Sequence, residues 1–174
     1  GLSVTIDTAI ATPAAPNLDS ASDTGTSNTD DLTSDTTPTF TGTVEANSTV
    51  NLYHSGTTLV GTATANGSGA YSVTSSALTD ATRSFTVTAT DPAGNLSASS
   101  PGIPVTIDTT PLSAPTSAPD LAISSDTGAS NTDNITGDTT PTFTGTGATA
   151  NAIVRLYASG ALVGSTTADG AGTY

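Results

Sequence analysis

The chain has 174 residues but a mass of only 16.8 kDa, so small side chains dominate, and 15 acidic residues against two Arg give a formal net charge of −13. Without Cys it has no disulfide scaffold, and without Lys it lacks the basic patch that nucleic-acid binding needs. No apolar run approaches the roughly 18 residues of a membrane span, so membrane insertion is excluded as well.

An internal repeat organises the sequence. Residues 23–43 and 126–146 are related by an offset of 103 and are identical at 17 of 21 positions. A period near 100 residues is typical of an immunoglobulin-type module and too long for a solenoid coil. Val, Ile and Thr are frequent and charge density is low, which favours strands over disorder. We therefore expect an all-β fold of tandem seven-stranded immunoglobulin-like Greek-key β-sandwiches, the second one truncated.

The repeat divides the chain into five expected segments. Residues 1–8 are expected to be the last strand of a preceding repeat, followed by a linker over 9–17. Residues 18–108 should form one complete sandwich. A Pro-rich linker over 109–119 is expected to be extended and semi-rigid. Residues 120–174 should hold a partial second sandwich with strands A to E.

Alternation of apolar and polar residues predicts the seven strands of the complete repeat. They are expected near Leu18 and over 37–44, 49–54, 58–65, 70–74, 83–90 and 103–108. Tight turns are predicted at Ser55-Gly56 and over 66–69. The side chains expected to point inward are Phe40, Gly42, Val50, Leu52, Tyr71, Val73, Phe85, Val87, Ala89, Ile103, Val105 and Ile107.

Acidic and amide side chains gather in the loops, and they are the candidate metal ligands. The loop between strands A and B carries most of them in both repeats, and the rest follow strands F and G. The full set is Asp7, Asp23, Asn28, Asp30, Asp35, Asp91, Asp108, Asp126, Asn131, Asp133 and Asp138.

The topology of a sandwich predicts which of these side chains can meet. Successive loops of an antiparallel sandwich alternate between its two poles. The A–B loop should therefore lie beside Asp108, where strand G leaves the module. At the other pole, Asp91 should lie near Glu45 and face Asp7.

Carboxylates that gather without Lys or Arg to neutralise them favour a bound cation. Ca²⁺ takes six to eight oxygen ligands in flexible geometry, whereas zinc prefers His or Cys, and the only His is His54. The alternative is that each Asp or Asn merely caps a turn. For a single residue the alternative is the simpler interpretation, and for the repeated cluster we expect structural Ca²⁺.

Catalysis is not expected from this sequence. The only candidate base, His54, is replaced by Ala158 in the second repeat. Tyr53 and Tyr157 leave open a sugar-stacking surface, which would make the chain a carbohydrate- or surface-binding module of a secreted enzyme. Half-buried sheet tyrosines explain the same pattern.

The repeat resembles the bacterial immunoglobulin-like domains that are strung in tandem along giant, type I-secreted adhesins and biofilm-associated surface proteins. The resemblance rests on the motifs SDTG, DTTPTFTGT, TATDPAGN and VTIDTTP. It implies Ca²⁺ at module junctions, with Asp23, Asp30, Asp35, Asp91 and Asp108 as ligands.

The resemblance also implies an extracellular location at the bacterial cell surface. The expected function is that of a calcium-stabilised spacer in a monomeric rod, which projects a distal binding domain for attachment or biofilm formation. Its expected partners are the neighbouring repeats, while other domains contact the host, the biofilm or another surface.

Overall fold

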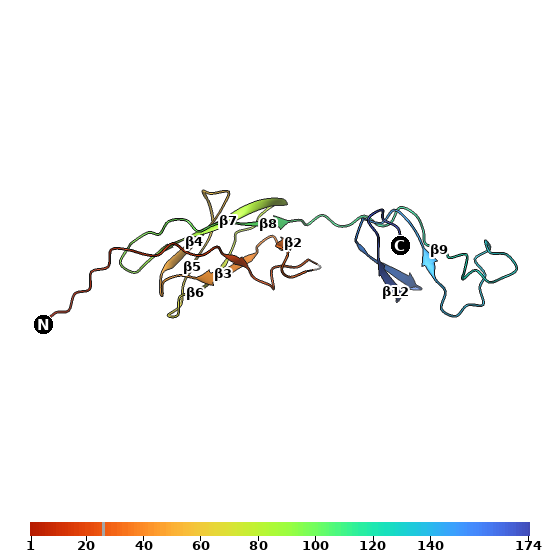
Figure 1. Cartoon of the computed structure of the whole chain (residues 1–174), viewed down its shortest axis with the longest axis horizontal. Helices are drawn as coiled ribbons and strands as arrows, with labels where there is room; N and C mark the ends of the chain where they lie inside the picture. The colour runs from red at the N-terminus through yellow and green to blue at the C-terminus, as the bar shows by residue number, and fades with distance from the viewer. Residues whose placement is uncertain (26) are drawn as a thin grey trace. The chain divides into compact units, whose positions relative to one another are not determined.

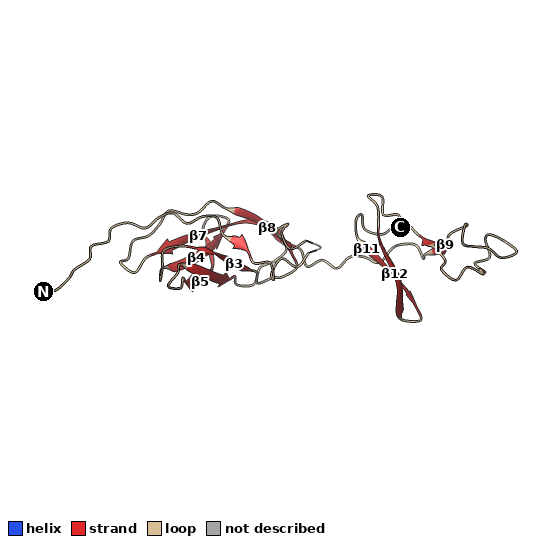
Figure 2. Cartoon of the chain, turned by 60° about the horizontal axis from the view of Figure 1, so that its bottom comes forward, coloured by secondary structure: helices blue, strands red, loops and turns tan. Residues whose placement is uncertain are grey.

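The computed structural model describes residues 1–25 and 27–174, and the expected all-β fold is confirmed because strands are the only regular elements in these residues (Figures 1 and 2). None of the described residues belongs to a helix long and apolar enough to cross a membrane. The chain divides into two units, Gly1–Thr110 and Pro111–Tyr174.

The first unit is a sandwich of two sheets (Figure 2). One is antiparallel and consists, in spatial order, of β1 (Asn17–Leu18), β3 (Thr39–Thr43) and β6 (Ala70–Thr74). The other consists, in spatial order, of β2 (Leu32–Thr33), β8 (Ile103–Ile107), β7 (Ala81–Thr90), β4 (Thr49–His54) and β5 (Thr58–Thr64).

The core of this sandwich lies between the two sheets. The rings of Phe40 and Phe85 are tilted against each other with centroids 4.6 Å apart, and both side chains are fully buried. Val50, Leu52 and Val87 are likewise 0% exposed. The predicted inward-facing residues are therefore confirmed as buried, except that Gly42 and Ile103 are half-buried.

The first unit has an eighth strand that the sequence did not predict. β2 pairs in parallel with β8, and the backbone N–H groups of Thr106 and Asp108 donate to the carbonyl oxygens of Asp31 and Thr33 at 2.9 Å. The hydroxyl of the buried Thr33 donates to the carbonyl oxygen of Ser22 and fastens the strand from the other side. All seven expected strands are present, and β2 adds to them; alternation could not predict it because it has only two residues.

The guanidinium of Arg83 on β7 is held by the loop that precedes this strand. Its two terminal nitrogens donate to the carbonyl and the hydroxyl of Thr79, at 2.6 and 2.8 Å. The only other Arg is Arg155, which lies in a strand of the second unit.

The second unit holds the first part of the same sandwich. Its strands are β9 (Asp120–Leu121), β10 (Phe143–Thr144), β11 (Ile153–Ala158) and β12 (Ala161–Thr167). The fifth expected strand does not form; in its place Gly145 and Tyr174 exchange backbone hydrogen bonds of 2.8 and 3.0 Å. No counterpart of β7 or β8 covers the sheet in the described part of this unit, so Phe143, the counterpart of the buried Phe40, is 38% exposed.

The segments expected to flank the sandwich contain almost no regular structure. Residues 1–8 form no strand and are exposed, because a strand needs a partner for its backbone. Pro13 and Pro16, inside the expected linker over 9–17, are buried. In the linker over 109–119 every residue is exposed, although the Ser117 hydroxyl donates to the carbonyl of Thr146 at 2.7 Å.

Candidate metal-binding sites

Three carboxylates from distant parts of the sequence meet at one pole of the first unit. Asp7 precedes the sandwich, Glu45 lies between β3 and β4, and Asp91 directly follows β7. One carboxylate oxygen from each lies within 4.8 Å of the other two. We call these three residues the junction cluster; no other group of three His or acidic residues in the described chain meets this spacing.

Asp91 is the buried and rigid member of the junction cluster. It is 4% exposed, and the backbone N–H and side-chain amide of Asn95 donate to its two oxygens at 2.8 and 2.7 Å. Desolvation opposes ionisation, but the hydrogen bonds from Asn95 and from the backbone of Ala93 and Gly94 outweigh it, so the pKa of Asp91 lies below its usual value. The carboxylate is thus held ionised with its orientation fixed.

The other two members of the junction cluster are exposed. The Asp7 carboxylate accepts a hydrogen bond from the backbone N–H of Ala9 at 3.2 Å, which forms an Asx-type turn. The proximity of Asp91, Glu45 and Asp7 is what the alternation of loops between poles predicts. Glu45 was expected near the site but not among its ligands, because a single Glu in a short loop carries no spacing signal.

The acidic A–B loop adopts the same fold in both units. The carboxylates of Asp23 and Asp126 accept hydrogen bonds from the backbone N–H groups of Asp31 and Asn134, each at 3.2 Å. Asp31 and Asn134 both take a left-handed conformation, with φ of 58° and 57°. Hydrogen bonds therefore hold the loop in the same defined conformation in both units.

Each copy of this loop contains a buried carboxylate oxygen without a partner. Asp23 and Asp126 are 4% and 5% exposed, and the Oδ1 atom of each accepts no hydrogen bond. Burying an ionised oxygen without compensation is costly. A cation at this oxygen would remove the cost.

Glycines keep the space in these loops open. A Cβ atom at Gly25 would lie 3.1 Å from the carbonyl oxygen of Leu32 and 3.6 Å from Oδ1 of Asp30. In the second unit, a Cβ atom at Gly128 would lie 3.4 Å from Oδ1 of Asp133. Carboxylate and carbonyl oxygens thus lie close to the open side of each glycine, and such oxygens are the ligands that Ca²⁺ takes.

The remaining predicted ligands have local hydrogen-bond partners or are exposed. Asp35 accepts from the Ser22 hydroxyl at 2.9 Å and from the Thr37 N–H at 2.8 Å. Asp138 repeats this pattern with Ser125 and Thr140, and these bonds lower its pKa against a smaller desolvation effect. Asn28 and Asn131 are exposed.

Asp108 lies beside the A–B loop through its backbone, as expected, but its carboxylate does not join a cluster. It accepts a hydrogen bond from the Thr110 N–H at 2.9 Å. The carboxylates of the A–B loop and of Asp108 form no group of three within the spacing of the junction cluster. Nearby backbone N–H groups donate hydrogen bonds to these carboxylates instead.

Repulsion is concentrated at Asp31 in the first unit. Desolvation raises the pKa of this carboxyl, and the nearby charges of Asp23 and Asp30 raise it further. The second unit has the neutral Asn134 at this position. A cation would relieve the same repulsion in the first unit.

Comparison with known proteins identifies the module. The profile of the bacterial Ig-like domain family matches residues 9–109 and matches again over 112–174. No curated protein matches the chain.

Proposed function

Because the chain belongs to the bacterial Ig-like domain family, with two matches that cover most of its length, we propose that it is a calcium-stabilised spacer segment of a bacterial cell-surface adhesin. The observation that carries the proposal is the junction cluster. It joins the segment before the sandwich to two loops of the sandwich, so an ion held there ties a module to the chain that enters it.

The residues present suit Ca²⁺ at two kinds of site. Asp7, Glu45 and Asp91 supply carboxylate oxygens at the pole of the module. In the A–B loops, the unpartnered oxygens of Asp23 and Asp126 supply one ligand each. Hard oxygen donors that come from several irregular loops favour Ca²⁺ over Mg²⁺, which demands octahedral geometry.

The ion would supply stability rather than chemistry. Without it, unpaired carboxylates repel each other and weaken a module whose core has few aromatic residues. A ligand that binds only the folded state adds about 2.7 kcal/mol of stability at a hundredfold excess over Kd. Extracellular modules bind Ca²⁺ with a Kd of roughly 10⁻⁴–10⁻³ M. In this proposal, the folded module is therefore less stable where calcium is scarce and more stable outside the cell.

The spacer role follows from the same ions. Tying Asp7 to the pole of the sandwich restricts the angle between a module and the chain before it. Modules stiffened in this way would hold a distal binding domain away from the cell, for attachment or biofilm formation. The neighbouring repeats are the direct partners in this proposal, and type I secretion is the proposed export route.

A structural rather than enzymatic role agrees with the setting of His54. Its ring meets Phe85 edge-on at 6.1 Å, and its Nδ1 lies 3.1 Å from the Ser55 hydroxyl. Burial and the charge of Arg83 lower the pKa of this imidazole. His54 therefore has the contacts of a side chain that packs on a sheet.

Thermal unfolding of the whole chain tests the calcium proposal. Millimolar Ca²⁺ should raise the midpoint of the first unit relative to EDTA, as followed by circular dichroism. Glu45→Gln should lose the part of this shift that comes from the junction cluster, because Glu45 is exposed and its carboxylate serves only this cluster. Asp120→Asn, in the second unit, should keep it. An identical midpoint with and without Ca²⁺ in the parent chain would falsify the proposal.

A further inference from the structure

The turn between β5 and β6 contains the only Asn-Gly pair of the chain, Asn66-Gly67. Such a pair is chemically labile, because the backbone nitrogen that follows the Asn can attack the carbonyl carbon of its side chain. Gly has no side chain to hinder this attack. Asn66 and Gly67 are both exposed, and a Cβ atom at Gly67 would meet no heavy atom within 4 Å. Solvent and a moving side chain therefore have room here.

Three donors hold the carbonyl oxygen of the Asn66 side chain. Its Oδ1 atom accepts from the backbone N–H groups of Ser68 and Ala70 at 2.9 and 3.0 Å, and from the Ser68 hydroxyl at 2.7 Å. Negative charge develops on this oxygen when a nucleophile adds to the carbon that bears it. Donors already fixed around the oxygen stabilise that charge. The turn therefore polarises the carboxamide for attack.

The two nitrogens that would react are not engaged. In the part of the chain that the structure describes, neither the N–H of Gly67 nor the side-chain amide nitrogen of Asn66 donates a hydrogen bond. The first nitrogen would be the nucleophile and the second the leaving group. The reaction therefore has to break no hydrogen bond at either of them.

The second unit carries at this position the acid that the reaction would produce. Asp169-Gly170 aligns with Asn66-Gly67 at the repeat offset of 103. Oδ1 of Asp169 accepts from the backbone N–H groups of Ala171 and Thr173 at 2.9 and 2.8 Å, which repeats the two backbone contacts of Asn66. The turn thus keeps these hydrogen bonds when an acid stands in place of the amide.

We propose that Asn66 of the folded chain converts spontaneously to Asp and isoaspartate. The Gly67 nitrogen bonds to Cγ of Asn66, the Cγ–Nδ2 bond breaks, and Nδ2 leaves as ammonia with the proton that Gly67 gave up. Water then opens the resulting five-membered imide, adding its hydroxyl to one carbonyl carbon and returning a proton to the Gly67 nitrogen. Attack at Cγ gives Asp, and attack at the backbone carbonyl carbon gives isoaspartate. No ion takes part, so the proposal is independent of the calcium sites.

The two products differ in their effect on the fold. Asp leaves the main chain as it is. Isoaspartate adds a methylene carbon to the main chain before Gly67 and converts the former backbone carbonyl into a carboxylate. In the unmodified chain, this carbonyl accepts from the N–H groups of Gly69 and Asn47, at 2.9 and 3.3 Å. Isoaspartate therefore alters the link between this turn and the loop between β3 and β4.

Mass spectrometry of the whole chain, kept folded at neutral pH, tests the proposal. Chymotryptic peptides report conversion of amide to acid at each Asn, and electron-transfer fragmentation separates Asp from isoaspartate. The reference is Asn47, because the following Ser48 is fully buried and donates its N–H to the Glu45 carbonyl at 3.2 Å. Conversion at Asn66 should be at least about tenfold faster, which corresponds to about 1.4 kcal/mol of activation free energy.

Two variants separate the contribution of the Asn-Gly pair from that of the turn. Gly67→Ala places a methyl group in open space and should slow conversion at Asn66 at least about tenfold, whereas the matched Gly170→Ala should leave it unchanged. Ser68→Ala removes the hydroxyl donor, so it should slow conversion in the folded chain but not in urea. Equal rates at Asn66 and Asn47 in the folded parent, or a folded Ser68→Ala chain that converts as fast as the parent, would overturn the proposal.

Discussion

At the residue scale, the two copies of the A–B loop differ in one informative way. The left-handed position is Asp31 in the first unit and Asn134 in the second. Asn and Asp both tolerate this conformation, so the backbone does not distinguish them. The difference is charge, since Asp31 faces the carboxylates of Asp23 and Asp30.

Asp31→Asn is therefore expected to stabilise the first unit in the absence of calcium. The pKa of Asp31 is raised in the folded state, so its favourable contribution is present below the unfolded pKa and is lost as the pH rises through the folded value. The variant should gain roughly 0.5 kcal/mol at pH 7, the size typical of exposed charge interactions, and the gain should vanish near pH 3. Urea unfolding in EDTA at both pH values measures it.

Asp35→Asn is the matched control for this prediction. Its carboxylate accepts hydrogen bonds from Ser22 and Thr37, so loss of the charge should destabilise the unit. If the two variants change stability in the same direction, charge repulsion is not what distinguishes Asp31.

At the scale of elements, β2 links the acidic loop to the sandwich. Thr33 is 1% exposed, and its hydroxyl donates to the Ser22 carbonyl and accepts from the Asp35 N–H at 2.9 Å. The Thr24 hydroxyl also lies 3.1 Å from the Thr33 hydroxyl, so three hydrogen bonds of the loop depend on one buried side chain of a two-residue strand.

Thr33→Val keeps the shape of this side chain and removes its hydroxyl. The unpaired groups left behind should cost about 1–3 kcal/mol in urea unfolding. Hydrogen exchange at the amides of Thr106 and Asp108, which donate to β2, should accelerate. Thr43→Val, at an exposed strand position, should stay within about 0.5 kcal/mol of the parent. Unchanged exchange in Thr33→Val would mean that the hydroxyl does not hold β2.

The longer strands of the first unit could be predicted from sequence, and its acidic sites only in part. Alternation places 49–54 and 70–74 at the bounds of β4 and β6, because one face of each strand is buried and the other is wet. β2 could not be predicted in this way, because two residues are too few to show alternation. Its partner β8 also lies some 70 residues away in the sequence. Topology alone places Asp91 near Asp7. The Asp35 and Asp108 carboxylates instead accept local hydrogen bonds, from the N–H groups of Thr37 and Thr110, which residue spacing does not reveal.

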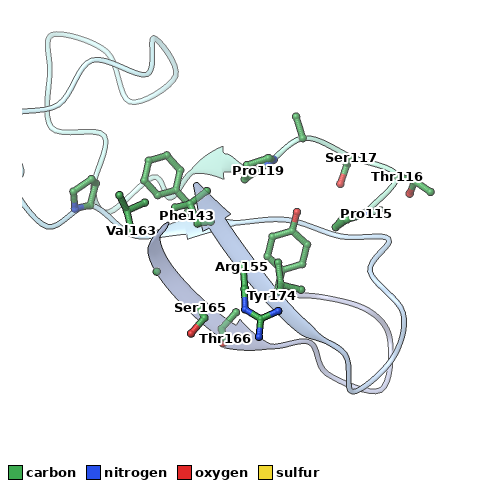
Figure 3. Close-up of a pocket in the computed structure, with 15 residues that line it drawn as sticks. Pro115, Thr116, Ser117, Pro119, Phe143, Arg155, Val163, Ser165, Thr166 and Tyr174 are labelled. Carbon is green, nitrogen blue, oxygen red and sulfur yellow. The ribbon is translucent and has the colours of Figure 1, made fainter. Parts of the chain in front are cut away.

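At the scale of the whole molecule, the two units have related sequences but unequal cores. Val50 and Leu52 are fully buried in β4, which β7 pairs with along one edge. Val154 and Leu156 of β11 are instead half-buried, beside a cavity that is also lined by Phe143, Val163 and Tyr174 (Figure 3). A two-stranded hairpin with one wet face is marginally stable by itself. The second unit should therefore open more easily than the first.

Hydrogen exchange of the whole chain measures this difference directly. At concentrations where the chain is monomeric, hydrogen-bonded amides of β11 should exchange at least about tenfold faster than those of β4. Addition of a peptide with the sequence of residues 81–108 should slow exchange in β11 and leave β4 unchanged. Equal protection of β4 and β11 in the free chain would show that the pairing of β4 with β7 does not govern the stability of this strand.

The positions of the two arginines bear on how the chain resists proteases. Proteases of the trypsin type cut after Lys or Arg, so this chain offers them only the bonds that follow Arg83 and Arg155. Both bonds lie inside strands, and the Arg83 side chain is also engaged by Thr79. A protease needs an extended, freely accessible segment, so cleavage at Arg83 must wait for β7 to leave the centre of its sheet. Resistance to digestion at Arg83 would thus be set by the stability of the fold, and the calcium ions proposed above would protect this bond without touching it.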